Sequence, residues 1–523
     1  MGLSQHRNIG DMCQQVMLRR ELLEKEESQL ITAVLNIRSK LNELVPVFQL
    51  PPEVLEEVFT LCISWLYGYQ KPKHRLSWTQ VCGAWRHLAF SSARLWQHID
   101  LGDSRLADEF LFRSKGAPLF ITSSSPLKLT PNTLTLHSRR LESIDVFLFP
   151  NDMAHLFSSI GRYLPMLRNL SLKITPMSST IYLDLSLPSL RRLSLEGVAI
   201  RWEECSNLTH FSLRGYNTAA CPSISQLHDI LEASPQLEYV RLECFVPPSV
   251  KVVERPPIVL LHLKEFTISS KPAVSRSILS SVLLSPKTRL QLYLSLSEDL
   301  HSLFPEGLPY ASDSSVPYKA TSLLSHHRGK SIDVSSIRLS RHGAYFIRPS
   351  SSTWCDDPSA FLLSLSSASP LSSYVCTSLS HILDLTTISH LELNTGVLLD
   401  ITVKSLENLF RDLDCLRSLA IAFNDIDQLF EVLQFRDNAT GSMYLPRLET
   451  LSFSKPYDLW WHFGGRWMES IFATIKIRRT HGCPLRTLEF FSCHGLSQSV
   501  VQDLGRSVDQ VTVKDQSNVK KNE

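Results

Sequence analysis

The stretch LPPEVLEEVFTLCISWLYG, residues 50–68, predicts an amphipathic helix. Its two prolines suit the first turn of a helix, where the backbone donors are unpaired in any case. Val54 and Val58 lie beside a run of apolar residues spaced by four and three, which indicates one apolar stripe. We expect the helix to end at Gly68. The residues of the predicted stripe are Leu55, Phe59, Cys62 and Leu66.

A second apolar helix is predicted after a short basic loop. The loop reads KPKHR over residues 71–75, and Ser77 is suited to cap the helix that follows. Residues 50–101 are close to the lower size limit for a core that is stable alone. They also carry more apolar side chains than so small a bundle buries, so we expect some of them to contact a partner. The second stripe comprises Val81, Trp85, Leu88 and Ala89.

The order of these residues resembles an F-box, in particular the F-boxes of the large families found in mushroom-forming fungi. The resemblance rests on separated motifs: LPPEVL from residue 50, Val58-Phe59, TQVCGAWR from residue 79, and Leu95-Trp96. The basic loop is longer than in many F-boxes, and a helical subdomain of another kind is the alternative. An F-box implies docking to a Skp-type adaptor and, through it, to the cullin and RING subunits of a ubiquitin ligase. The docking or supporting residues that the resemblance implies are Leu50, Pro51, Val54, Leu55, Val58, Phe59, Val81, Cys82 and Trp85.

A long helix is predicted before this segment, over residues 12–48, within an N-terminal region of residues 1–49. Apolar residues recur there every seven positions, and further ones interleave from Leu30 onward, which is the pattern of a coiled coil. Pro46 should kink or end the helix. Either the helix forms a homodimer, or its stripe packs on the F-box or on the strands that follow; we favour packing, and therefore a monomer. The heptad positions are Val16, Leu23, Leu30, Ile37 and Leu44.

A recurring pattern, L-x-x-L-x-L, occupies much of residues 102–513. It appears at residues 167–172, 190–195 and 208–213, and continues irregularly to residues 508–513. Amphipathic helical patterns lie between these segments, as at residues 224–231. The region resembles degenerate leucine-rich repeats. The predicted fold class is therefore α/β: a small all-α F-box followed by an irregular solenoid of parallel strands with outer helices. Serine- and proline-rich insertions are expected at residues 311–325 and 349–373, and a disordered tail at 514–523.

Composition and motifs give no argument for catalysis or for nucleic-acid binding. The chain has 523 residues, with 53 basic and 51 acidic side chains, so neither nucleic acid nor a charged membrane surface is an expected partner. Gly329-Lys330-Ser331 lacks the earlier glycine of a phosphate-binding loop, and no metal or cofactor motif is present. The cysteines form no C-x-x-C pair, and no signal peptide or apolar span is visible. We expect a non-enzymatic protein of the cytoplasm, the nucleus or both.

An aromatic segment at residues 455–467 is the best candidate for substrate binding. It follows a predicted strand and precedes a predicted helix, and aromatic and arginine side chains dominate protein interfaces. The alternative, which we favour, is that the aromatic rings fill space beneath a large loop. The function hypothesis is a substrate adaptor of an SCF-type ligase, and the second is a repeat scaffold outside any ligase. The candidate residues are Tyr457, Trp460, Trp461, Arg466 and Trp467.

Overall fold

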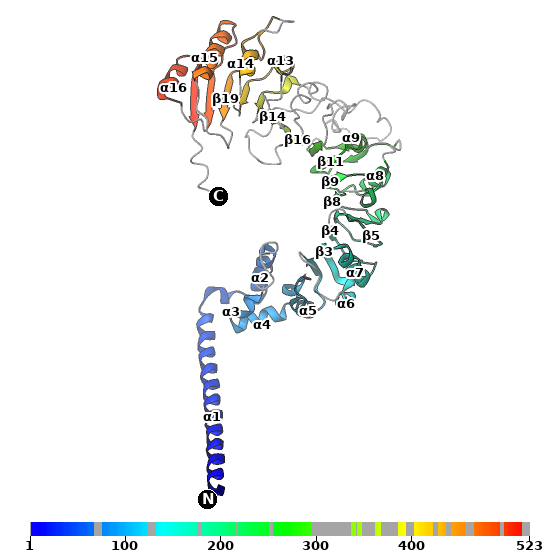
Figure 1. Ribbon diagram of the computed structural model, residues 1–523, viewed down its shortest axis with the longest axis vertical. Coiled ribbons are helices and arrows are strands. Elements are labelled where there is room, and N and C mark those ends of the chain that lie inside the picture. The colour runs from blue at the N-terminus through cyan, green and yellow to red at the C-terminus, as the bar shows by residue number, and fades with distance from the viewer. Residues whose placement is uncertain are drawn as a thin grey trace. The chain divides into compact units, whose positions relative to one another are not determined.

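The computed structural model divides the chain into two compact units, Met1–Val146 and Phe147–Glu523. It shows a mixed α/β structure in which a helical N-terminal region precedes a sheet of mainly parallel strands (Figure 1). The residues that it describes are 2–66, 76–123, 132–175, 179–215, 218–249, 255–285, 287–294, 336–340, 343–347, 361–367, 385–393, 402–421, 427–435, 441–454, 465–491 and 496–514.

The first unit contains the helices of the N-terminal region and three short parallel strands. Strand β2 lies between β1 and β3. The elements are α1 (Gly2–Glu43), the 3-10 turn η1 (Pro46–Gln49), α2 (Pro52–Leu66), α3 (Trp78–Val81), α4 (Gly83–Ser91), η3 (Ala93–Trp96), β1 (His98–Asp100), α5 (Ser104–Arg113), β2 (Leu119–Ser123), α6 (Asn132–Thr135), η4 (Ser138–Arg140) and β3 (Leu141–Leu148).

The N-terminal helix differs from the prediction in its bounds and in its packing. Helix α1 extends back to Gly2 and ends at Glu43, because Pro46 cannot donate to a continuing helix and starts η1 instead. The favoured interpretation was that its apolar stripe packs on the F-box or on the strands that follow. Within this unit the packing on the F-box is wrong. Every side chain from Gln14 to Leu41 is exposed.

The second predicted helix is divided in two. Helix α3 ends at Val81, and Cys82 adopts an extended conformation with φ −158° before α4 begins. The side chain of Ser77 makes no capping hydrogen bond, contrary to prediction. Instead, the thiol of Cys82 accepts from the backbone N–H of Trp85 at 3.4 Å and caps α4. The predicted end of α2 at Gly68 and the basic loop lie outside the described residues.

The second unit is organised by a parallel sheet that follows the leucine pattern. Strands β4, β6, β8, β9, β11 and β13 pair in that order, all parallel. Strands β17 to β21 form a second parallel run in chain order. The strands are β4 (Asn169–Ile174), β6 (Arg192–Glu196), β8 (His210–Arg214), β9 (Tyr239–Phe245), β11 (Glu265–Ser270), β13 (Arg289–Leu294), β17 (His390–Leu393), β18 (Ser418–Ile421), β19 (Thr450–Ser454), β20 (Thr487–Phe491) and β21 (Gln510–Lys514).

The two parallel runs are joined in reversed chain order. Strand β16 (Phe361–Ser367) pairs parallel with β13, β15 (Gly343–Ile347) pairs antiparallel with β16 and with β14 (Ser336–Ser340), and β14 pairs parallel with β17. The prediction of a loop at residues 349–373 is therefore wrong for Phe361–Ser367, which form β16. Its FLLSLSS segment alternates apolar and serine residues, which is the period of a strand. The insertion predicted at 311–325 lies outside the described residues. The tail predicted from residue 514 begins one residue later, because Lys514 is the last residue of β21.

Helices lie along one side of this sheet (Figure 1). Helix α8 confirms the predicted amphipathic pattern, with Leu227 and Leu231 buried and a capping box between Ser223 and Gln226. The helices are α7 (Pro150–Ile160), α8 (Ile224–Glu232), α9 (Pro272–Ser280), α13 (Val403–Arg411), α14 (Asp427–Gln434), α15 (Gly465–Thr480) and α16 (Gln498–Gly505). Shorter elements are β5 (Ile181–Leu183), β7 (Val198–Ile200), η5 (Trp202–Glu204), η6 (Thr218–Ala220), β10 (Ile258–Leu260), β12 (Val282–Leu284) and η8 (Leu385–Thr387).

One buried cation stabilises the C-terminal run. Arg478 of α15 is fully buried and donates to the carbonyl oxygens of Tyr444 and Leu445 at 2.9 and 2.6 Å. Leu445 has a positive φ of 52°, which is uncommon for a residue other than glycine, and its carbonyl also accepts from the backbone N–H of Leu448 at 3.1 Å. Burial lowers the pKa of Arg478 to about 10, so the side chain remains charged at neutral pH.

Among the described helices, none combines the length with the apolar character that a membrane span requires.

Candidate functional site

Helix α2 carries two apolar stripes, and one of them forms the core of the helical region. Leu55, Phe59 and Ile63 are 7%, 3% and 4% exposed and lie one turn apart on the inner side. The sequence pattern assigned Cys62 to this stripe, but Cys62 is exposed and Ile63 takes its place. Leu66 is the last residue of α2, and its side chain is outside the description.

Aromatic rings hold α2 on the helices that follow it. The ring of Phe59 lies 4.8 Å from Trp78 and 4.9 Å from Trp85, both edge-on, and Trp85 lies 5.8 Å from Phe48. Such pairs contribute beyond the area that they bury. Trp85 is therefore a supporting residue that fixes Phe59 and, through it, the orientation of α2.

The second stripe of α2 is exposed. Val54, Val58 and Leu61 follow helical spacing and are 45%, 39% and 55% exposed. Leu50, just before the helix, is also 39% exposed. A contiguous apolar face on an otherwise packed bundle is typical of a surface that binds another protein. We call this set of four residues the α2 outer face.

The predicted docking residues fall into two groups. Leu55, Phe59 and Trp85 are interior or supporting, and Cys82 is the cap of α4. Leu50, Pro51, Val54 and Val58 are exposed on or next to α2, whereas Val81 is exposed on a different helix, α3. Sequence reasoning missed Leu61, although its position seven residues after Val54 is the signal that would have identified it.

Polar contacts connect α2 with the residues after α4, and α4 with α3. The hydroxyl of Ser92, just after α4, donates to a carboxylate oxygen of Glu56 at 2.5 Å. The guanidinium of Arg86 donates to the carbonyl of Thr79 at 2.6 Å and so joins α4 to α3. These contacts hold α2 in place before a partner binds. They therefore reduce the conformational entropy that the α2 outer face loses on binding.

The strands β4 to β13 present a second candidate surface, a polar face of three rows. Each row consists of residues that lie opposite one another in the strand register. The middle row has small serines at its start, and the outer rows, apart from Asn169, are charged or aromatic. The pattern search used only the leucines, so it missed these residues at the alternate positions. The rows are Asn169, Arg192, His210, Tyr239, Glu265 and Arg289; Ser171, Ser194, Ser212, Arg241, Thr267 and Gln291; and Lys173, Glu196, Arg214 and Glu243.

Ion pairs and stacking order this polar face. Lys173 lies 2.9 Å from Glu196, and Arg214 lies 2.8 Å from Glu243. The ring of His210 stacks on a tyrosine of the next strand at 4.7 Å. Burial, followed by nearby cations, lowers the pKa of His210, so this side chain is neutral at physiological pH.

The aromatic segment lies where the sequence predicts it, between a strand and a helix. Strand β19 ends at Ser454 and α15 begins at Gly465. Tyr457, Trp460 and Trp461 are outside the described residues. Arg466 and Trp467 belong to the first turn of α15, and their side chains are likewise outside the description.

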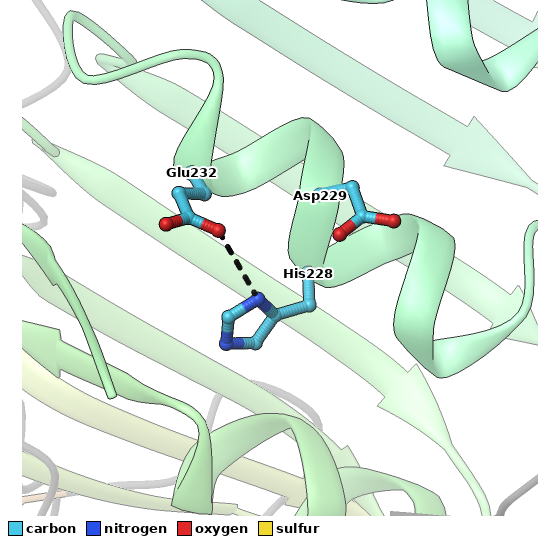
Figure 2. A group of neighbouring side chains, drawn as sticks. All are labelled: His228, Asp229 and Glu232. Atoms are coloured by element: carbon cyan, nitrogen blue, oxygen red, sulfur yellow. Dashed lines mark ion pairs between the residues drawn. The ribbon is translucent and has the colours of Figure 1, made fainter. Parts of the chain in front are cut away.

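Two groups of side chains are of kinds that bind a metal or react as nucleophiles, the acidic and histidine residues of α8 and the cysteines. His228, Asp229 and Glu232 lie on α8, with Nδ1 of His228 3.9 Å from a Glu232 oxygen (Figure 2). Asp229 is paired with Arg255, and within the part of the chain that the structure describes the group consists of these three side chains of one helix, fewer than the four ligands of a structural zinc site. The described cysteines are free thiols, and burial raises the pKa of Cys205 to about 12, far from a reactive thiolate.

The comparison with protein families matches part of the chain. Residues 47–102 match the F-box-like family, and residues 47–102 thus form an F-box-like domain. The match includes α2, α3, α4 and the α2 outer face. A search of the curated proteins finds no match to this chain.

Proposed function

We propose that this protein is a substrate-recognition subunit of an SCF-type ubiquitin ligase. The F-box-like domain suggests an adaptor role in ubiquitin ligation and binding to a Skp-type adaptor. The observation that carries the proposal is the α2 outer face. Three apolar residues on a helix whose other side is packed, and Leu50 just before it, are exposed, and binding to a partner protein would remove such a face from water.

The strand region supplies the substrate-binding surface in this proposal. We interpret it as degenerate leucine-rich repeats, because the strands that follow the leucine pattern are parallel and helices lie on one side. Binding a substrate beside a ligase raises the effective concentration of its lysines near the charged enzyme, and no chemistry by this chain is needed. The polar face of β4 to β13 and the aromatic segment with Trp460 and Trp461 are the two candidate surfaces.

A charge placed on the α2 outer face tests the adaptor interaction. In the full chain, Val54→Asp with Val58→Asp would put two carboxylates into an apolar interface, where an unpaired charge is expensive. We expect the affinity for a purified Skp-type adaptor, measured by biolayer interferometry, to fall by more than about 100-fold, on the scale of hot-spot losses. Both positions are exposed, so the fold should be retained.

The matched control changes exposed apolar residues outside the F-box-like domain. Phe112 and Leu136 are 82% and 87% exposed in the same unit, and their replacement by Asp should leave adaptor binding unchanged. Undiminished binding by the Val54→Asp, Val58→Asp variant would contradict the docking face. A wild-type chain that binds no Skp-type adaptor, yet binds another protein through its strands, would favour the scaffold function instead.

Substrate capture is tested separately. Trp460→Ala with Trp461→Ala should weaken capture of a ligase-dependent substrate by more than about 2 kcal/mol if the aromatic segment is the hot spot. Adaptor binding should be unchanged. If capture persists, the charge reversal Arg241→Glu, an exposed position on the polar face, should disrupt it instead.

A further inference from the structure

Helix α1 is a long helix whose described side chains, from Gln14 to Leu41, have no tertiary cover within the described residues. It spans Gly2–Glu43, and its side chains from Gln14 to Leu41 are all exposed. A helix of this length extends about 63 Å. In isolation such a helix gains little from hydrogen bonding alone, and most helical stability comes from packing of an apolar face. The exposed heptad residues are Val16 (63%), Leu23 (57%), Leu30 (64%), Ile37 (60%) and Leu44 (75%).

We propose that a second copy of this chain covers this stripe, as an antiparallel coiled-coil dimer centred on Thr32. The proposal is independent of ligase function. We choose a second copy as the partner because the charges along α1 are complementary to those of a second α1 that runs in the opposite direction. The core and flanking positions show this complementarity.

The core positions exclude a parallel pairing in register. The apolar residues every seven positions occupy one core position of the heptad, and Arg20, Glu27, Val34 and Leu41 occupy the other. A parallel dimer would place Arg20 against Arg20 and Glu27 against Glu27 within the seam. Like charges at facing core positions oppose that pairing.

Reversing one helix about Thr32 removes both conflicts. Leu23 then faces Leu41, and Leu30 faces Val34, so the central layers are apolar. Arg20 faces Leu44 of the other copy, the residue that directly follows α1, and Glu27 faces Ile37. The guanidinium of Arg20 already lies 2.8 Å from Glu24 of the same helix, and the Arg20 side chain is 73% exposed. A long cationic side chain can occupy a core position in this way while its charge stays solvated.

The flanking positions match in the same register. Glu24 lies beside Arg38 of the other copy, and Glu26 lies beside Lys40, each pair occurring twice by symmetry. At the centre, Ile31 and Ala33 approach their own counterparts. Shifting the register by one heptad would instead bring Arg19 against Lys40. Opposite charges at flanking positions set orientation and register in coiled coils.

The first test is the mass of the full chain by sedimentation velocity over a concentration series. We expect a reversible dimer of the 59.3 kDa chain. Leu30→Asp with Ile37→Asp should give a monomer at all concentrations. The matched control is Leu22→Asp with Leu35→Asp, which changes equally exposed leucines (65% and 57%) off the seam and should remain dimeric. Circular dichroism verifies that both variants fold.

The second test concerns orientation. Arg38→Glu with Lys40→Glu should weaken the dimer at least tenfold, and adding Glu24→Arg with Glu26→Lys should restore it. In a parallel dimer the first pair of changes would have little effect, and the second would place a like charge beside Arg19 of the other copy. A wild-type monomer, or a dimer that survives the Leu30, Ile37 changes, would overturn the proposal. A dimer indifferent to the charge exchange would overturn the antiparallel orientation.

Discussion

Replacing Phe59 with Ala should open the F-box-like domain and leave the strand region intact. Phe59 is 3% exposed and packs edge-on against Trp78 and Trp85 at 4.8 and 4.9 Å. Truncation of a buried Phe costs about 3–5 kcal/mol. At about 0.05–0.15 kcal/mol per residue, a module of this size has about 3–8 kcal/mol in total. The substitution therefore removes most of its stability.

Hydrogen exchange followed by mass spectrometry measures this locally. Peptides from α2 and α4 should lose roughly 100- to 4,000-fold in protection, because each 1.4 kcal/mol is a factor of about ten. Peptides from β8 to β13 serve as the internal reference. Val58→Ala, at a 39% exposed position, should change stability by less than about 0.5 kcal/mol. Wild-type protection in the Phe59→Ala chain would refute the assignment of this residue to the core, and with it the two-sided description of α2.

Three further outcomes are expected. Arg478→Met should lower the free energy of unfolding of the second unit by about 3–6 kcal/mol, because two hydrogen bonds from a charged donor are lost at about 1.5–3 kcal/mol each; an unchanged melting temperature in circular dichroism would contradict this. Burial lowers the pKa of His390, so the folded protein favours the neutral ring. Its contribution to the free energy of unfolding is complete above the unfolded pKa of about 6.5 and is lost as the pH falls below that value. His390→Gln should therefore flatten the decline of melting temperature between about pH 7 and about pH 5.5, and parallel curves would count against it. Ser92→Ala should cost about 1 kcal/mol in the protection of α2 without weakening adaptor binding, whereas lost binding would assign Ser92 to the interface.

The strands were predictable because their chemistry repeats. In residues 192–196 and 210–214 buried apolar residues alternate with polar ones, which is the period of a strand, and β6 and β8 follow from this alternation. Strand β16 was missed because its serines suggest a loop by composition, although the alternation in FLLSLSS predicts a strand. Composition and periodicity gave opposite answers there, and periodicity was right.

The candidate site was predictable in position but not in orientation. Both sides of α2 are apolar, so the spacing after Phe59 permits either Cys62 or Ile63 as the next buried residue. Only the rings of Trp78 and Trp85, which come from helices later in the chain, determine which stripe is buried. The break at Cys82 was equally inaccessible, because a thiol is an uncommon helix cap.

The reversed order of β14, β15 and β16 has a consequence for folding kinetics. Neighbouring strands in each parallel run are close in sequence, so either run can grow by adding one unit at a time. The junction is different, because Leu290 of β13 lies opposite Leu363 of β16 and two antiparallel pairs must form before β17 can join. Closing that long segment carries an entropic cost that the local steps do not. The two runs should therefore nucleate separately, with their joining as the slow step, and a stalled junction would leave the edges of β13 and β17 open to pairing with other chains.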